Sequence, residues 1–281
     1  MKTYPNVKNI IILSISILIT VNFCFGQKQR NIWYFGEGAG LDFNGGAPVP
    51  IIGGNIFPNP QAIGEATIAE GSASICDSTG TLLFYSNGEN IWNKNHQLMP
   101  NGDSLMGMYS STQSSFIIPL PLSDSIFYVF TTDGLERNLE DGLRYSIVDM
   151  CLDNGLGDII PGQKNTLILD AVSEKLAAIN HQNGKDIWLI AHKFNSDAFY
   201  AYQISENGII DTVITHIGSV HTGNGFHSAI GQMKPSPNGN KIALVFSNVT
   251  PAVAELFDFD KATGVLYNHI NLTTDNNEYG I

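Results

Sequence analysis

The chain has 281 residues and carries 26 acidic against 14 basic side chains, for a formal net charge of −12 at pH 7. An acidic surface of this kind excludes nucleic acid and anionic lipid as the main partner, since both are bound by basic surfaces. Hydrophobic residues make up 43% and charged residues 14%, which excludes a disordered chain and, with 15 Phe, 10 Tyr and 28 Gly, favours strands and tight turns over helices.

The N-terminus predicts a secretory signal peptide over residues 1–26. Two lysines form a basic region, and the apolar run "IIILSISILITV" follows at 10–21. Twelve residues are too few to cross a bilayer, which takes about 20. The run therefore indicates export, with cleavage after the small residue Gly26. Acylation of Cys24 is the alternative, but Phe23 is bulky where such sites want a small residue.

The mature chain is then residues 27–281. Its 12 basic and 26 acidic residues give a net charge of −14, because the leader holds two lysines and no acid. We expect a protein that is secreted or on the outer cell surface, without a membrane span. Cys76 and Cys151 lie in strand-like apolar contexts, which favours buried free thiols over a disulfide, although export permits pairing.

A polar or glycine turn followed by a dense apolar strand recurs along the chain. The five instances are "NIWYFG" (31–36), "GTLLFYS" (80–86), "SDSIFYVFT" (123–131), "GKDIWLIAH" (184–192) and "GNKIALVFS" (239–247). Their central residues are spaced by 51, 43, 61 and 55 positions. Kelch units repeat at about 50 residues and WD units at about 40–45.

Further strands follow several of these runs. They are "LRYSIVDM" (143–150), "AFYAYQIS" (198–205), "IIDTVI" (209–214), "ELFDFD" (255–260) and "VLYNHI" (265–270). This alternation predicts repeated four-stranded antiparallel sheets. The fold class is therefore all-β: a β-propeller with WD-repeat-like or kelch-like blades, incomplete, with about four to five blades over residues 27–281. A β-sandwich is the alternative, and "AVSEKLAAI" (171–179) is the best candidate for a helix.

Several motifs together resemble the N-terminal propeller of large Bacteroidetes surface proteins that are exported by the type IX system and often labelled gliding-motility-associated. The motifs are "NIWYFGEGAGLDFN", "DSTGTLLFYSNGENIWN", "YSIVDMCLDNGLGDI", "EKLAAINHQNGKDIWLIAH", "KPSPNGNKIALVFSN" and "ELFDFDKATGV". The resemblance covers residues 30–281. "SPNG" stands where such repeats commonly carry a Ser-Pro-Asp-Gly turn, and Asn and Asp both start such turns.

The resemblance implies that the propeller is followed by PKD-type immunoglobulin-like modules and a C-terminal sorting domain, neither of which this sequence contains. An unclosed propeller also exposes packing faces and strand edges. We therefore expect the chain to be a fragment, with "NNEYGI" (276–281) leading into a further turn-strand unit.

Two groups of residues suggest metal ligands. His216, His221 and His227 share one glycine-rich segment, but no acidic or cysteine partner stands at a recognised zinc spacing, so an inter-blade loop is favoured. "DNGLGD" (153–158) and "DFDKATG" (258–264) hold oxygens of the kind Ca²⁺ prefers, yet they lack the full EF-hand pattern, and turn chemistry explains them without a metal. We assign no cofactor, with Ca²⁺ as the open alternative.

The remaining candidates are weaker. By strand alternation His192 shares a face with Asp186 and Trp188, and a core tryptophan is favoured over a ligand site; His181 stands at the other end of that strand. The acids of one loop are Asp133, Glu136, Glu140 and Asp141. No nucleophile elbow, phosphate loop or sialidase-type box occurs, so no catalytic, cofactor-binding or metal-binding residue is assigned.

Four short Asp-Ser/Thr-apolar patterns match the acceptor pattern associated with O-glycosylation in exported Bacteroidetes proteins, although Asp-Ser also simply opens turns. The acceptors are Ser78, Ser104, Ser125 and Thr212. As a hypothesis, one or more of them is glycosylated, which an intact mass of the host-purified protein would show.

The sequence-based expectation of function is a non-enzymatic module of a multidomain surface protein that binds or displays an extracellular protein or glycan. The alternative is a carbohydrate-active hydrolase or lyase on the same scaffold. An enzyme would show two or more carboxylates converging in one central pocket with shifted pKa values.

Overall fold

A computed structural model describes residues 28–36, 38–56, 70–222, 228–246 and 253–273. The predicted signal peptide and the terminal "NNEYGI" lie outside these residues. The described chain is built of strands and two three-residue 3-10 helices, η1 (Leu135–Arg137) and η2 (Asp153–Gly155). The all-β class is therefore confirmed. No helix among the described residues is long and apolar enough to cross a membrane.

The first three sheets come from the N-terminal half of the chain. The first comprises β1 (Ile32–Phe35), β2 (Ala39–Asp42) and β3 (Val49–Ile52); the second β4 (Ala73–Cys76), β5 (Leu82–Ser86) and β6 (Ile91–Asn93); the third β7 (Ser115–Pro119), β8 (Ile126–Thr132), β9 (Leu143–Asp149), β10 (Asp158–Ile159) and β11 (Thr166–Leu169). In the third sheet both β10 and β11 pair with β9.

Two regular four-stranded sheets follow. The fourth comprises β12 (Val172–Asn180), β13 (Ile187–Lys193), β14 (Ala198–Ser205) and β15 (Gly208–His216); the fifth β16 (Met233–Pro235), β17 (Lys241–Phe246), β18 (Val253–Phe259) and β19 (Leu266–Thr273). All strand pairs in the five sheets are antiparallel, and each sheet is formed by a continuous stretch of chain.

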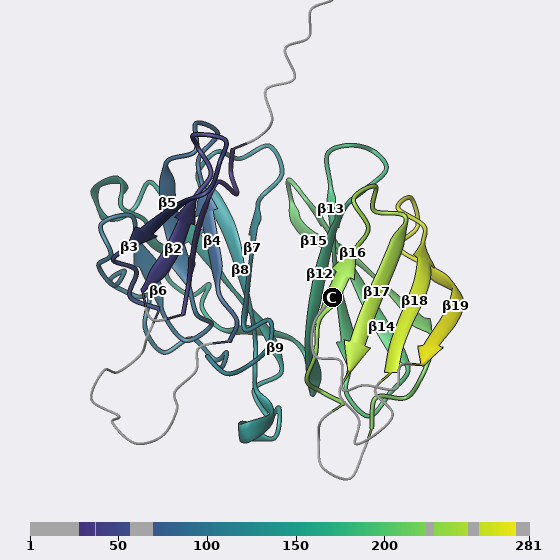
Figure 1. Cartoon of the computed structure of the whole chain (residues 1–281). Helices are drawn as coiled ribbons and strands as arrows, with labels where there is room; N and C mark the ends of the chain where they lie inside the picture. The colour runs from purple at the N-terminus through teal and green to yellow at the C-terminus, as the bar shows by residue number, and fades with distance from the viewer. Residues whose placement is uncertain (1–27, 37, 57–69, 223–227, 247–252, 274–281) are drawn as a thin grey trace, which may run out of the picture.

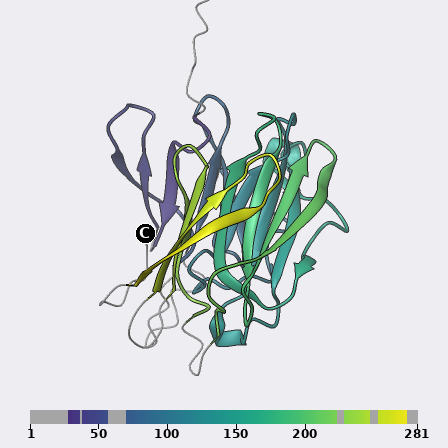
Figure 2. The same ribbon diagram turned by 90° about the vertical axis from the view of Figure 1, so that its right-hand side faces the viewer.

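The first strands of the sheets face one another near the centre of the molecule (Figure 1). β1 lies beside β4, β4 beside β7, and β12 beside both β16 and β8. Figure 1 shows the three early sheets grouped on one side and the fourth and fifth sheets on the other, and in Figure 2 the fifth sheet (yellow-green) lies toward the viewer.

Apolar layers join the sheets in chain order. Tyr34 of the first sheet packs with Tyr85 of the second, and Phe84 of the second with Phe127 of the third. The third and fourth sheets share a layer that includes Tyr128, and the fourth and fifth share one centred on Trp188. None of the apolar clusters among the described residues joins the first sheet to the fifth, so this series of packed sheets is open.

Two predictions need correction. In the described part of the chain, only the fourth and fifth sheets have the expected four strands; the first two have three strands, the third has five, and no sheet closes on itself. The predicted helix at 171–179 is wrong, because that segment forms β12. Its polar residues Glu174 and Lys175 are buried and bound by neighbouring loops, and these tertiary contacts override the local helix preference.

Candidate functional site

A cavity of about 450 Å³ opens at the centre of the molecule, where the first strands meet. We call it the hub cleft. Its lining comes from β1, β4 and β7, the residues that precede them, and the residue before β16: Arg30, Trp33–Phe35, Glu70–Ile75, Thr112, Gln113, Ser115–Ile117 and Gln232. Residues far apart in sequence converge on it.

Two aromatic side chains of β1 give the hub cleft an apolar wall. Trp33 is 50% exposed and Phe35 is 40% exposed, and strand alternation places them on one face of the sheet. The Trp33 ring packs against Phe43, with centroids 4.9 Å apart, and its indole N–H donates to the Arg30 carbonyl at 2.8 Å. The indole is therefore held in place while part of its surface stays open to a ligand.

Hydroxyl and amide groups line the rest of the cleft. The Ser72 hydroxyl donates to the Tyr34 carbonyl, and the Ser74 hydroxyl accepts from the Tyr34 N–H at 3.0 Å. The Ser115 hydroxyl is buried and has no hydrogen-bond partner among the described residues. Glu70, an exposed residue, brings the one carboxylate among the described lining residues.

The side-chain amide of Gln113 joins three sheets at the hub. It donates to the Leu176 carbonyl at 2.8 Å and accepts from the Leu176 and Met233 N–H groups, each at 3.0 Å. Gln113 stands just before β7, Leu176 lies in β12 and Met233 begins β16. One side chain thus links the first strands of three sheets, of which β7 lines the cleft.

Two buried charges of β12 extend this polar layer. The Glu174 carboxylate accepts from the N–H and hydroxyl of Thr112 and from the Leu135 N–H. Burial raises the pKa of Glu174, and these hydrogen bonds oppose that rise. Lys175 donates to the carbonyls of Ser228 and Ala229, both at 2.8 Å, and burial lowers its pKa to about 7. Both side chains are sealed from solvent and act as loop anchors.

Two buried imidazoles stack beside this layer. The rings of His192 and His221 lie 3.6 Å apart between centroids, and both side chains are fully buried. Neither nitrogen of His192 has a partner among the described residues, while His221 Nε2 lies 3.4 Å from Glu255 Oε2. Burial lowers the pKa of both histidines well below the usual value, so the pair is neutral at pH 7.

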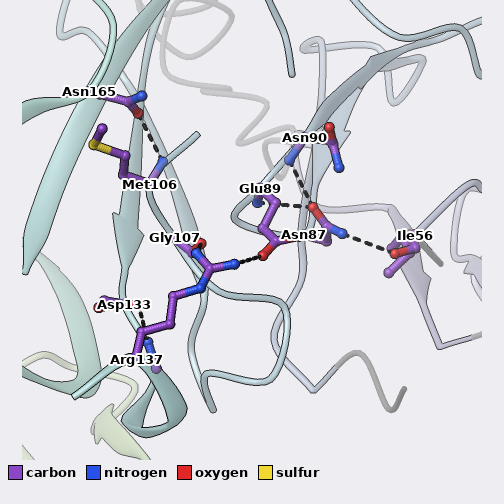
Figure 3. Close-up of polar contacts among 10 residues, drawn as sticks. Ile56, Asn87, Glu89, Asn90, Met106, Gly107, Asp133, Arg137 and Asn165 are labelled. Carbon is purple, nitrogen blue, oxygen red and sulfur yellow. Dashed lines mark hydrogen bonds and ion pairs between the residues drawn. The ribbon is translucent and has the colours of Figure 1, made fainter. Parts of the chain in front are cut away.

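A second cavity, of about 380 Å³, lies between the β5–β6 turn and the β8–β9 loop. There Arg137 donates to Glu89 at 2.6 Å and to the Gly107 carbonyl at 3.2 Å, as Figure 3 shows. Burial raises the pKa of both Glu89 and Asp133. Asp133 is sealed, with its carboxylate accepting from the Gly134 and Asp141 N–H groups. Two carboxyl groups with raised pKa thus converge near Arg137, but away from the hub cleft.

The acids predicted together in the β8–β9 loop differ in their surroundings, although Asp133 accepts a hydrogen bond from the Asp141 N–H at 3.0 Å. Asp141 lines the second cavity, whereas Glu136 and Glu140 do not. The contacts of Asp133 and Arg137 tie this loop to its neighbours.

The predicted metal ligands do not come together among the described residues. His216 is exposed and pairs with Asp197 at 2.7 Å, His221 is buried, and His227 lies outside the described residues. Asp158 accepts from the backbone and side chain of Asn101. Asp258 pairs with Lys241 and Asn268. No group of three His, Cys, Asp or Glu residues suited to a metal ion is found in the described part of the chain.

The other candidates are resolved by burial. Trp188 is 1% exposed and belongs to the core, as predicted, and His181 stacks on it at 5.4 Å. Both described cysteines are free, but only Cys76 is buried; the prediction of burial is wrong for Cys151, which lies in the turn after β9. Residues Ser78, Ser104 and Thr212 are exposed and Ser125 is half-buried.

Sequence reasoning missed the hub cleft. The sequence gives only a weak signal for the hub cleft, because Trp33 and Phe35 resemble core residues of a dense apolar strand. Among the described residues no other sheet packs on that face of β1, so both side chains stay partly exposed.

No protein-family model and no curated protein matches the chain. Among solved structures, the chain is similar to a protein of Bacteroides fragilis NCTC 9343 that is provisionally assigned as a 6-phosphogluconolactonase, with 13% sequence identity and a TM-score of 0.42. The match covers 85% of this chain and 66% of that one, just under two thirds of its length.

The matched structure is described as an enzyme, so it gives no support to the expectation of a non-enzymatic display module. A likeness at this identity and TM-score assigns no activity to this chain.

Proposed function

We propose that the five sheets are blades of an open β-propeller. The support is their arrangement: each sheet is antiparallel, formed by one stretch of chain, and packed on the next through an apolar layer. The first strands of the sheets lie near a common centre, as they do around a propeller axis. The repeat spacing of about 50 residues supports the same arrangement.

We further propose that the chain binds a carbohydrate in the hub cleft and acts on it there. The observation that carries this is the pairing of exposed aromatic rings with hydroxyl and amide groups in one cavity of about 450 Å³. Apolar faces of sugar rings pack on aromatic side chains, and sugar hydroxyls exchange hydrogen bonds with groups such as those of the half-buried Ser72 and Ser74. Trp33 and Phe35 supply the aromatic face.

Glu70 is the residue to which we assign proton transfer. Glu70 carries the one carboxylate among the described residues that line the cleft. Because Glu70 is exposed, this carboxylate is accessible to a bound substrate. Glycoside hydrolysis generally uses two carboxyl groups. The preceding residues 57–69 lie outside the described residues, so the structure assigns no second group.

The predicted location supports a glycan as the substrate class. We propose an exported protein, from the basic and apolar pattern of residues 1–26, and a place in the type IX-secreted class, from the motifs of the strand repeats. Extracellular glycans are accessible to such a protein.

Tryptophan fluorescence tests the binding half of this proposal. The chain has three tryptophans, of which Trp92 and Trp188 are buried and Trp33 is half exposed. A glycan panel is screened against the mature chain, and a binder should change the Trp33 emission. Trp33→Ala should weaken binding about tenfold or more, by the loss of one aromatic contact surface. Tyr267→Ala is the matched control, since Tyr267 is 45% exposed on β19 and does not line the cleft.

Turnover is measured on the same binders. Released reducing ends report hydrolysis, and an unsaturated product reports elimination. Glu70→Gln should abolish turnover and leave binding within about twofold, because it removes the acid and keeps the size and polarity. Binding without any turnover would refute the catalytic half, and a Tyr267→Ala loss equal to that of Trp33→Ala would refute the site.

A further inference from the structure

A third cavity, of about 440 Å³, adjoins the hub cleft at Arg30, which lines both. We call it the basic pocket. Its walls are the end of β12 (Ala178–Asn180), the segment Lys234–Gly239, which begins in β16, and the side chains of Arg30 and Lys261. It lies in the gap between β12 and the turn that joins β16 to β17.

The charge of the basic pocket is opposite to that of the molecule. Arg30, Lys234 and Lys261 line it, and no carboxylate is among its described lining residues. The whole chain, by contrast, carries a net charge of −12. The Arg30 guanidinium forms no hydrogen bond or ion pair within the described part of the chain, and both Arg30 and Lys234 are exposed. A concave wall of one charge sign concentrates ligands of the other.

The "SPNG" turn forms a rigid wall of this pocket. The Asn238 side chain accepts from the Ser236 hydroxyl and the Asn240 N–H, and the Ser236 hydroxyl accepts from the Lys241 N–H. Gly239 has a φ of +72°, and a Cβ there would lie 2.8 Å from the Ile179 side chain. The turn therefore requires glycine at this position.

Hydrogen bonds fix Lys261 at both its side-chain ammonium group and its backbone carbonyl. Its ammonium group donates to the Asn238 carbonyl at 3.0 Å, and its own carbonyl accepts from the buried Trp188 indole at 2.9 Å. An ammonium group has three donors, so further protons stay available to a ligand. The core tryptophan and the turn thus fix one cation at the pocket wall.

We propose that the basic pocket is an anionic subsite, which selects a carbohydrate bearing carboxylate or sulfate groups. The proposal rests on the proposed carbohydrate site in the hub cleft and names its substrate class. Arg30 lies at the junction, where its planar guanidinium binds a carboxylate or sulfate with two parallel hydrogen bonds. One oligosaccharide then places a sugar ring against Trp33 and an acidic group between Lys234 and Lys261.

The test compares probes that share a backbone and differ in charge. Calorimetric titration of the mature chain uses oligogalacturonate against its methyl ester, and dextran sulfate against dextran, at low and high salt. The charged probe of a pair should bind about tenfold more tightly, and added salt should remove that preference. Which pair responds separates carboxylate from sulfate recognition.

Variants assign the preference to the pocket. Lys234→Gln and Lys261→Gln should each weaken binding of the charged probe about two- to fivefold, and the double variant about tenfold, without affecting the neutral probe. Lys185→Gln is the matched control, since Lys185 is an exposed lysine that does not line the pocket. Lys234→Gln leaves the Lys261–Asn238 contact intact, so it is informative even if Lys261→Gln disturbs the turn.

The outcomes separate this inference from the function on which it rests. Equal binding of charged and neutral probes, or a Lys185→Gln effect equal to that of Lys234→Gln, overturns the anionic subsite. If charged probes bind through Lys234 and Trp33→Ala has no effect, the subsite stands and the hub cleft is refuted as the sugar site. If Trp33→Ala weakens glycan binding and Lys234→Gln removes the preference for the charged probe, both the hub cleft and the anionic subsite are supported.

Discussion

Gln113 offers the sharpest test of how the sheets are held around the hub. Gln113→Ala removes three hydrogen bonds, one from its amide to the Leu176 carbonyl and two to its oxygen from Leu176 and Met233. A neutral hydrogen bond contributes about 1 kcal/mol net to folding. The three together predict that the free energy of unfolding falls by about 3 kcal/mol.

Urea unfolding, followed by tryptophan fluorescence and by circular dichroism, measures this loss. Gln163→Ala is the control, because Gln163 is exposed and its side chain has no hydrogen bond among the described residues. Its effect should stay within about 0.5 kcal/mol. If Gln113→Ala costs less than about 1 kcal/mol, water replaces the amide without loss, and the side chain does not hold the three strands together.

Three further predictions follow from buried groups. Burial lowers the pKa of Lys175 from 10.5 to about 7, so between these pH values the unfolded chain binds a proton that the folded chain lacks. The free energy of unfolding should therefore rise with pH over this window, and Lys175→Met should flatten that rise in a series of melting temperatures. Ellman's reagent should label Cys151 in the folded chain but Cys76 only after urea is added, since burial raises the pKa of Cys76 and encloses it; equal rates would contradict this. Gly264→Ala should cost about 2 kcal/mol in urea unfolding, because Gly264 has a φ of +74° and a Cβ would lie 2.8 Å from the Trp188 ring; an unchanged midpoint would show that the ring gives way.

Among the strands that the sequence predicted well are the second strands of the last four sheets and the third strands of the last three. "GKDIWLIAH" contains β13 and "AFYAYQIS" is β14, because these strands pack apolar side chains on both faces and end at glycine or asparagine turns. Apart from β1, which lies within "NIWYFG", the first strands were harder to predict. β16 has only three residues, and β7 follows a run of serine and threonine whose partners lie far away in the sequence.

The segment 171–179 shows why local propensity failed at the hub. Leu176, Ala177 and Ala178 favour a helix by themselves. In the structure a register shift falls between Val172 and Leu176 of β12, and the residues in that interval turn toward neighbouring loops. Contacts such as Glu174 to Thr112 join residues 62 positions apart, so no local window contains them.

The candidate site was beyond sequence reasoning for a related reason. Trp33 and Trp188 stand in similar apolar strands, yet one is 50% exposed and the other 1%. The difference comes from position in the series: the sheet of Trp188 is packed between two neighbours, whereas the described residues pack against the first sheet on one side only. Exposure at Trp33 is a property of the sheet arrangement rather than of its own strand.

Polar side chains, rather than apolar packing alone, set the geometry of the hub. Hydrogen bonds have direction, so the amide of Gln113 fixes the offset between β7, β12 and β16 more narrowly than apolar contact does. The hub cleft is bordered by β7 and the residue before β16, so its shape depends on those offsets. Gln113→Ala should therefore lower both stability and glycan affinity, whereas Trp33→Ala should lower affinity and cost only about 1 kcal/mol of stability, from the loss of its hydrogen bond to the Arg30 carbonyl and its contact with Phe43. A Gln113 variant that is destabilised but binds at full strength would show that the cleft keeps its shape without the amide.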